Sequence, residues 1–203
     1  HTVNIPYNEK KLISVDIGFI VFNEITYPNL IKFFRENKIQ LEKSNMSFSV
    51  SVKDSSIEYC GKGINGMFSN KMNIFNLKFI KMFFEIINFY KKCSNINIDN
   101  ISKETLGSFL EKEDCSDYFI NYHIVPMIAA IWSIPPFEAK QMPLNFFINF
   151  FKNHGLFNLK NRPQWFTVSN RSKTYVNKVI NQISGEYYKN YLINKISRNN
   201  NNI

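Results

Sequence analysis

The chain has 203 residues, of which 44% are hydrophobic, 16% aromatic and 20% charged. This length suits one large domain or two small ones, and the composition excludes a disordered chain. The formal net charge is +9, but the basic residues are scattered and only four of them are Arg. Nucleic-acid binding favours clustered Lys and Arg, so general solvation explains the charge better and we expect no nucleic-acid partner.

Cysteine and histidine residues are few and dispersed, and no Cys-x-x-Cys pair occurs. They are Cys60, Cys93, Cys115, His1, His123 and His154. We therefore expect no metal site and no disulfide framework, which fits a reducing, cytoplasmic compartment.

A long charge-free stretch, residues 121–137, contains three prolines and is too short and broken to span a bilayer. We expect a cytoplasmic protein and leave peripheral contact with a membrane open. The chain starts with His and stops inside a polar run. We interpret it as a fragment of a longer protein.

The first part of the chain is rich in strand signals. Residues 1–5 and 12–17 are β-prone and flank a polar turn, which predicts a hairpin, and the apolar run 15–22 resembles a buried strand. A helix is expected from Thr26 or Asn29 to about Asn37. Residues 45–52 alternate between apolar and serine positions, which predicts a half-buried strand that pairs with residues 57–60. The glycines that follow, up to Gly66, indicate a tight turn.

The rest of the chain is mainly helical. Apolar spacing and end signals predict helices at 75–92, 102–110, 115–132 with an interruption near Pro126, 143–153 and 172–183. Strands are expected at 164–169 and 187–197. Together these elements indicate a mixed α/β or α+β fold.

Motifs for hydrolytic or phosphate chemistry are weak. No Walker loop and no Gly-x-Ser-x-Gly elbow occurs, and Gly61-x-Gly63-x-x-Gly66 precedes no strong helix signal. We interpret His123 as a core histidine and His154 as a residue at a helix end. We therefore predict no catalytic residue from side-chain chemistry.

One feature of the run 15–22 is unusual for a buried strand, since it contains both Asp16 and Gly18. A glycine in a strand lets another body approach the backbone, and a flat cofactor ring is one candidate. A β-bulge beside a capping aspartate explains the pair equally well.

Several stretches together carry a resemblance to a known family. They are "HTV" (1–3), "VDIGFIVFNEITYPNL" (15–30), "MSFSVS" (46–51), "AAIWSIPP" (129–136), "FFKNHGL" (150–156) and "RPQWFTV" (162–168), followed by Ser172, Tyr175 and Val176. In this order, and over nearly the whole chain, they resemble the FAD-dependent amine-oxidase-like oxidoreductases, in particular the bacterial group labelled NAD/FAD-binding protein.

The resemblance implies part of an FAD-binding Rossmann-like domain with a helical substrate domain inserted. Residues 1–60 would be the flavin-side part of the cofactor domain, 61–160 a segment of the substrate domain, and 161–203 a strand-helix-strand return. The family's Gly-x-Gly-x-x-Gly fingerprint for the FAD diphosphate would precede these residues. The resemblance therefore implies that this chain alone binds FAD weakly or not at all and is inactive.

The same resemblance implies which residues meet the cofactor and the substrate. His1, Thr2, Asp16, Gly18, Phe19 and Ser172 would lie at the FAD. Trp132 and Trp165 are candidates for the wall of the substrate cleft, although each fits an ordinary core aromatic as well. The family has two glycines where this chain has Asn170 and Arg171, a departure that puts close approach of this loop to the cofactor in question.

The activity implied by the resemblance is hydride transfer from a substrate C–H bond to flavin. The expected substrate is an amine or an apolar, lipid-like molecule. The alternative is a degenerate, non-catalytic member of the same fold that binds a lipid or a partner. The sequence does not identify the substrate, the electron acceptor or the oligomeric state.

Overall fold

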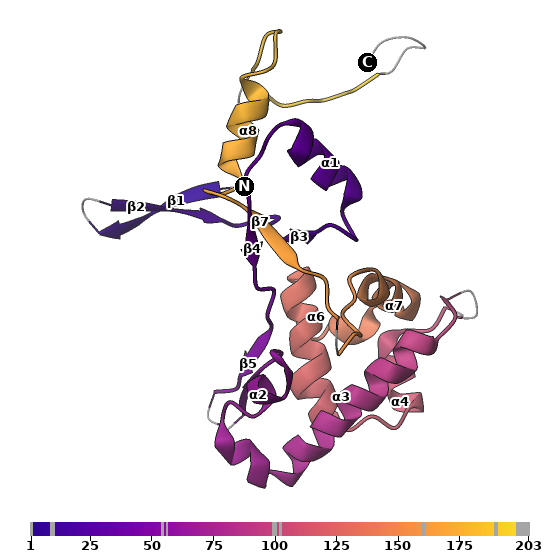
Figure 1. The fold of residues 1–203 in the computed structure, drawn as a ribbon. Helices are drawn as coiled ribbons and strands as arrows, with labels where there is room; N and C mark the ends of the chain where they lie inside the picture. Colours follow the sequence, from indigo (N-terminus) through magenta and orange to yellow (C-terminus); the bar gives the residue numbers. More distant parts are fainter. Residues whose placement is uncertain are drawn as a thin grey trace. The chain divides into compact units, whose positions relative to one another are not determined.

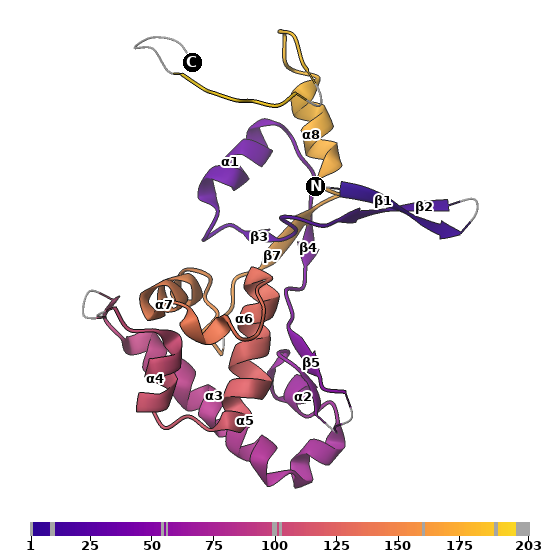
Figure 2. The same ribbon diagram turned by 180° about the vertical axis from the view of Figure 1, so that it is seen from behind.

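A computed structural model describes residues 2–8, 11–53, 55, 57–98, 101, 103–159, 161–188 and 191–197. It shows a mixed α/β protein with small antiparallel sheets, which confirms the predicted mixed class (Figures 1 and 2). The chain divides into two compact units. The hairpin unit comprises His1–Phe22, Pro28–Lys43 and Phe166–Ile203, and the helical unit comprises Asn23–Tyr27 and Ser44–Trp165.

The hairpin unit begins with the predicted β-hairpin. Strands β1 (Thr2–Asn8) and β2 (Lys11–Asp16) pair antiparallel, and Thr2 lies opposite Asp16 at the open end of the ladder. The pairing therefore brings the first described residue beside the acid in the apolar run.

The prediction of one buried strand over residues 15–22 is wrong. Strand β2 ends at Asp16, and Ile17, Phe19 and Ile20 are exposed in the link that follows. The chain re-enters a ladder only at β3 (Phe22–Asn23), which belongs to a different sheet. The run cannot continue as one strand because its two ends pair in different sheets.

The second sheet has the strand order β3-β7-β4, with β7 (Trp165–Val168) in the middle and β4 (Leu41–Ser44) at an edge. Strand β7 confirms the strand expected near 164–169, whereas β4 was not predicted. Aromatic packing joins the neighbouring helices to this sheet. The Phe22 and Phe34 rings are 5.1 Å apart, and the Phe34 and Tyr175 rings are 5.3 Å apart.

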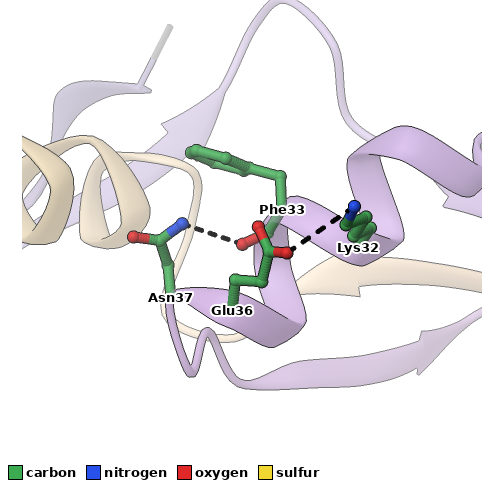
Figure 3. Close-up of polar contacts among 4 residues, drawn as sticks. All are labelled: Lys32, Phe33, Glu36 and Asn37. Carbon is green, nitrogen blue, oxygen red and sulfur yellow. Dashed lines mark hydrogen bonds and ion pairs between the residues drawn. The ribbon is translucent and has the colours of Figure 1, made fainter.

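Helix α1 (Pro28–Glu36) confirms the predicted helix and buries Ile31 and Phe34. Figure 3 shows how its last turn ends: the Asn37 amide donates to the Phe33 carbonyl at 2.9 Å, and Lys32 lies 3.9 Å from Glu36. The Phe33 carbonyl also accepts from the Asn37 backbone N–H at 3.1 Å, so the amide adds a second hydrogen bond at this helix end. The ion pair is exposed and adds little stability.

The C-terminal part contains one confirmed and one incorrect prediction. Helix α8 (Lys173–Ile180) lies within the predicted range 172–183. Within the predicted strand 187–197, described residues 187–188 and 191–197 form no strand, and their side chains are exposed. Their β-prone composition is insufficient because a strand also requires a hydrogen-bonded neighbour.

The helical unit starts with a second hairpin. Strands β5 (Ser49–Ser51) and β6 (Glu58–Cys60) pair antiparallel with Val50 opposite Tyr59, which confirms the predicted pairing over a shorter length. A short helix α2 (Gly63–Met67) and the 3-10 turn η1 (Lys71–Phe75) follow where only a tight turn was expected.

Helices and helical turns surround the main core of this unit, and each except Ala139–Gln141 overlaps a predicted helix. They are α3 (Leu77–Asn95), α4 (Leu106–Lys112), α5 (Asp117–Phe119), the π-helical segment η3 (Ile120–Ile124), α6 (Val125–Trp132), the 3-10 turn η4 (Ala139–Gln141) and α7 (Leu144–Asn153). Helix α4 starts later than predicted because Thr105 caps it by accepting from the Ser108 N–H at 3.2 Å. Predicted cap Ser102 lies outside the described residues.

The π-helical segment explains how the chain stays helical through Pro126. A proline in a helix removes one N–H and collides with the carbonyl one turn earlier. The wider turn at Ile120–Ile124 lies directly before Pro126, which occupies the first turn of α6.

Within the described residues, no helix has both the length and the apolar character needed to cross a bilayer.

Candidate functional site

The hairpin unit brings three of the predicted cofactor residues together around a buried carboxylate. The Thr2 hydroxyl donates to Asp16 Oδ1 at 2.5 Å. The Ser172 N–H donates to both carboxylate oxygens, at 3.1 and 3.0 Å, and its hydroxyl donates to Oδ2 at 3.2 Å. Asp16 therefore ties the open end of the hairpin to the start of α8.

The Thr2 hydroxyl also links the two segments from the other side. It accepts from the Lys173 N–H at 2.9 Å while it donates to Asp16. This hydroxyl thus acts as both a hydrogen-bond donor and an acceptor within one network. The other predicted cofactor residue of the amino-terminal segment, His1, lies outside the described residues.

The environment of Asp16 favours its ionised form. Burial by itself raises the pKa of this carboxyl, but the hydrogen bonds from Thr2 and Ser172 and the nearby Arg171 charge outweigh burial and lower the pKa. At neutral pH the site holds a fixed negative charge whose oxygens are already engaged. Asp16 is therefore suited to position backbone rather than to exchange a proton.

The loop before Ser172 has an unusual backbone. Asn170 has a φ of +59° and Arg171 a φ of +78°, so two successive non-glycine residues are left-handed. These are the two positions at which the resembled family has glycine, the residue that adopts positive φ most easily. Arg171 Nε donates to the Ser14 carbonyl at 2.9 Å, which attaches the loop to β2.

The other two predicted cofactor residues lie in the link after Asp16. Gly18 is exposed, and the Phe19 ring lies 6.1 Å from that of Phe22 while remaining 47% exposed. Ile20 accepts from the Thr167 hydroxyl at 2.9 Å, so β7 holds this link in place. Residues 17–20 therefore form a short link that is held at both ends and carries exposed apolar side chains.

The two predicted substrate-pocket tryptophans are joined by a column of rings in the helical unit. Trp132 lies 4.6 Å from Phe150, Phe150 lies 3.9 Å from His154, and His154 lies 6.2 Å from Trp165. Trp165 is buried and Trp132 half-buried. Both tryptophans therefore contribute to packing in this unit.

His154 is the residue of this column with polar chemistry. Its Nδ1 lies 2.8 Å from the Phe150 carbonyl, so Nδ1 carries the proton, and its Nε2 lies 3.1 Å from the Tyr27 hydroxyl. The predicted position at a helix end is confirmed, since His154 follows α7. The link to Tyr27 was not predicted, because the two residues are 127 positions apart.

His123 confirms its interpretation as a core histidine. It is buried in η3, with Nδ1 3.0 Å from the Tyr59 hydroxyl and Nε2 2.9 Å from the Tyr90 hydroxyl. The Tyr59 hydroxyl donates to the Tyr122 carbonyl, so it accepts from His123 Nδ1–H. Burial lowers the pKa of His123 to about 3, which keeps the ring neutral.

Other reactive groups are not assembled into a site. Within the described part of the chain, no three His, Cys, Asp or Glu side chains gather closely enough to hold a metal ion. Cys60, Cys93 and Cys115 are free thiols. Burial raises the pKa of Cys93 to about 12, so this thiol is unreactive at neutral pH.

Comparison of the chain with protein-family models and with curated proteins gives no match.

Proposed function

We propose that this chain forms the flavin-side part of an FAD-dependent, amine-oxidase-like oxidoreductase. The observation that carries the proposal is the Asp16 network. Thr2, Asp16 and Ser172 are assigned to the cofactor by the family resemblance, and they are hydrogen-bonded to one another although Asp16 and Ser172 are 156 positions apart. Such a long-range polar contact is a specific feature rather than a consequence of local sequence.

The residues after Asp16 fit the apolar face of a flavin ring. Ile17 is 62% exposed and Ile20 48% exposed, although both belong to a run of apolar residues. Gly18 has no side chain to keep a flat ring away from the backbone. In the proposed Rossmann-like cofactor domain, the bound flavin would supply hydride acceptance, and this segment would orient and desolvate it.

The left-handed pair at Asn170 and Arg171 supports the same assignment. Both residues have positive φ, the backbone conformation that glycine adopts without strain. Their conformation lets the Ser172 N–H reach Asp16, which is the contact that joins β2 to α8. The departure in sequence is therefore compatible with a preserved loop.

The helical unit would supply the substrate side of the reaction. We propose an amine or an apolar, lipid-like substrate, with Trp132 and Trp165 near its cleft. Hydride transfer to flavin requires no obligatory acid–base residue, and the proposal assigns none.

The decisive measurement is the visible absorbance spectrum of the protein purified after expression from the complete gene. Flavin bands that bleach when a substrate is added without oxygen would support the oxidoreductase. Gly18→Val should abolish the bands while the protein stays folded, because the added side chain occupies the proposed ring position. Gly185→Val is the matched control, since Gly185 has no atom within 4 Å of an added Cβ.

A colourless, folded protein that remains colourless with added FAD would overturn the proposal. That outcome would favour the non-catalytic alternative, a member of the same fold that carries a lipid or a partner.

A further inference from the structure

One surface of the helical unit exposes large apolar side chains to an unusual degree. It is formed by α2, η1 and the first turn of α3, and we name it the apolar tip. Its side chains are Ile64 (67% exposed), Met72 (63%), Ile74 (55%), Phe75 (80%) and Leu77 (83%). Single exposed apolar residues are common on protein surfaces, but several of them on adjoining segments indicate an interaction site.

The apolar tip is a packed structure. The Asn73 amide is buried and donates to the Glu58 carbonyl at 3.0 Å, which attaches η1 to β6. The Phe68 ring lies 5.8 Å from that of Phe79, which attaches the end of α2 to α3. Figure 1 shows these three elements together at one end of the helical unit. The exposed side chains therefore project from a fixed frame.

The charge of this surface has one sign. Lys62, Lys71, Lys78 and Lys81 are exposed, and the sequence contains no acidic residue between Glu58 and Glu85. A surface that combines exposed apolar side chains with lysines is complementary to a bilayer that carries anionic lipids. The apolar groups enter the acyl region, and the lysine stems extend along it to reach the phosphates.

Helix α3 extends this surface along one side. Leu77, Lys81 and Phe84 follow one another at helical spacing and are exposed, with Phe84 57% exposed. The opposite stripe, which includes Phe79 and Met82, is fully buried. The helix therefore has a buried apolar face and, opposite it, an exposed stripe that combines apolar and basic side chains.

A hollow of about 410 Å³ lies beside this stripe. Lys78 and Lys81 line it together with Ser116, Tyr118 and Asn121, and Asp117 is the single carboxylate at its wall. The Lys78 and Lys81 ammonium groups and the Asn121 amide are donors that suit a phosphate group, whereas the Ser116 hydroxyl already donates to Glu85 at 2.6 Å. The hollow thus provides a place for a lipid headgroup next to the apolar tip.

We propose that the apolar tip docks this protein on the surface of an anionic lipid bilayer. Phe75 and Leu77 enter the bilayer, and Lys71, Lys78 and Lys81 contact the phosphates. A second copy of the chain fits this surface less well, because two such faces would bring eight lysines of the same sign together. The proposal does not depend on the assignment of a flavin.

The test is sedimentation of the full chain with vesicles. Vesicles of phosphatidylcholine with phosphatidylserine should retain the protein, and vesicles of phosphatidylcholine alone should not. Replacing Phe75 and Leu77 together with Gln should weaken partitioning by at least about tenfold, since two large apolar side chains lose burial. Replacing Lys71, Lys78 and Lys81 with Gln should weaken it by on the order of a hundredfold.

Matched controls use equally exposed residues elsewhere in the helical unit. Phe137→Gln changes an aromatic side chain that is 76% exposed, and the pair Lys91→Gln and Lys112→Gln changes exposed lysines away from the tip. These variants should partition like the parent. All the substitutions are at exposed positions, so circular dichroism should show an unchanged fold.

Three outcomes would overturn the proposal. They are no binding to anionic vesicles, equal binding to both vesicle types, and equal losses in the tip and control variants. Light scattering tests the alternative that a second copy of the chain covers the tip. A dimer that dissociates when Phe75 and Leu77 are replaced, together with no vesicle binding, would assign the tip to self-association.

Discussion

Replacing Asp16 measures how strongly its network holds the hairpin to α8. Asp16→Ala removes every acceptor that the Thr2 hydroxyl and the Ser172 N–H and hydroxyl use. A buried donor left without a partner costs about 1–3 kcal/mol, and bonds to a charged acceptor are roughly twice as strong as neutral ones. We expect a loss of about 3 kcal/mol in the free energy of unfolding.

Asp16→Asn should cost less, about 1–2 kcal/mol. The amide oxygen can keep the bonds from Ser172, and the Thr2 hydroxyl can turn to accept from the amide while it still accepts from Lys173. Urea unfolding at pH 7 measures both variants, and Glu36→Ala, an exposed carboxylate in the same unit, is the control. Surface substitutions usually change the free energy of unfolding by no more than about 0.5 kcal/mol. An Asp16→Ala protein whose free energy of unfolding lies within this range of the parent would refute the reasoning.

The pH dependence gives an independent test of the same charge. The pKa of Asp16 is lowered in the folded state, so the unfolded state takes up the proton first as the pH falls. The stability difference between parent and Asp16→Asn should be constant well above the ordinary carboxyl pKa of 3.8 and should shrink as the pH falls below it. A difference that grows in acid would contradict the direction of the shift.

Three further predictions concern the helical unit. His123 binds a proton near pH 6.5 when unfolded but only near pH 3 when buried. The free energy of unfolding of the parent should therefore decrease as the pH is lowered from 6.5 to 3, by up to about 1.4 kcal/mol per pH unit. His123→Gln should remove this part of the slope in urea titrations. Gly66→Ala places a Cβ 2.5 Å from the Cys60 carbonyl oxygen and should cost about 1–3 kcal/mol, whereas Gly185→Ala, with no neighbour within 4 Å, should stay within about 0.5 kcal/mol. Phe79→Ala, at a fully buried position, should lower the free energy of unfolding by about 3–5 kcal/mol, and equal unfolding midpoints for it and for the parent would contradict the core described above.

Local signals in the sequence identified most helices and the two hairpins. Helix α3 shows why: Phe79, Ile86 and Tyr90 recur at helical spacing and are buried, although the cap at Asn76, which accepts from the Phe79 N–H at 3.1 Å, was not predicted. Periodicity and end caps act over a few residues, so they can be recognised without knowledge of the fold.

Sequence patterns failed where a ladder needed a distant partner. The run 15–22 divides between two sheets, and residues 191–197 form no strand despite their composition. Strand formation depends on a hydrogen-bonded neighbour that local composition does not specify.

The candidate site shows the same division. The sequence alone determined that Asp16 and Gly18 interrupt an apolar run and that Ser172 begins a helix. Only the tertiary structure decided that Asp16 and Ser172 meet, that His154 links Trp165 to Tyr27, and that Phe75 and Leu77 remain uncovered. Contacts and exposure of this kind depend on the packing of segments far apart in the chain, and a local pattern carries no information about that packing.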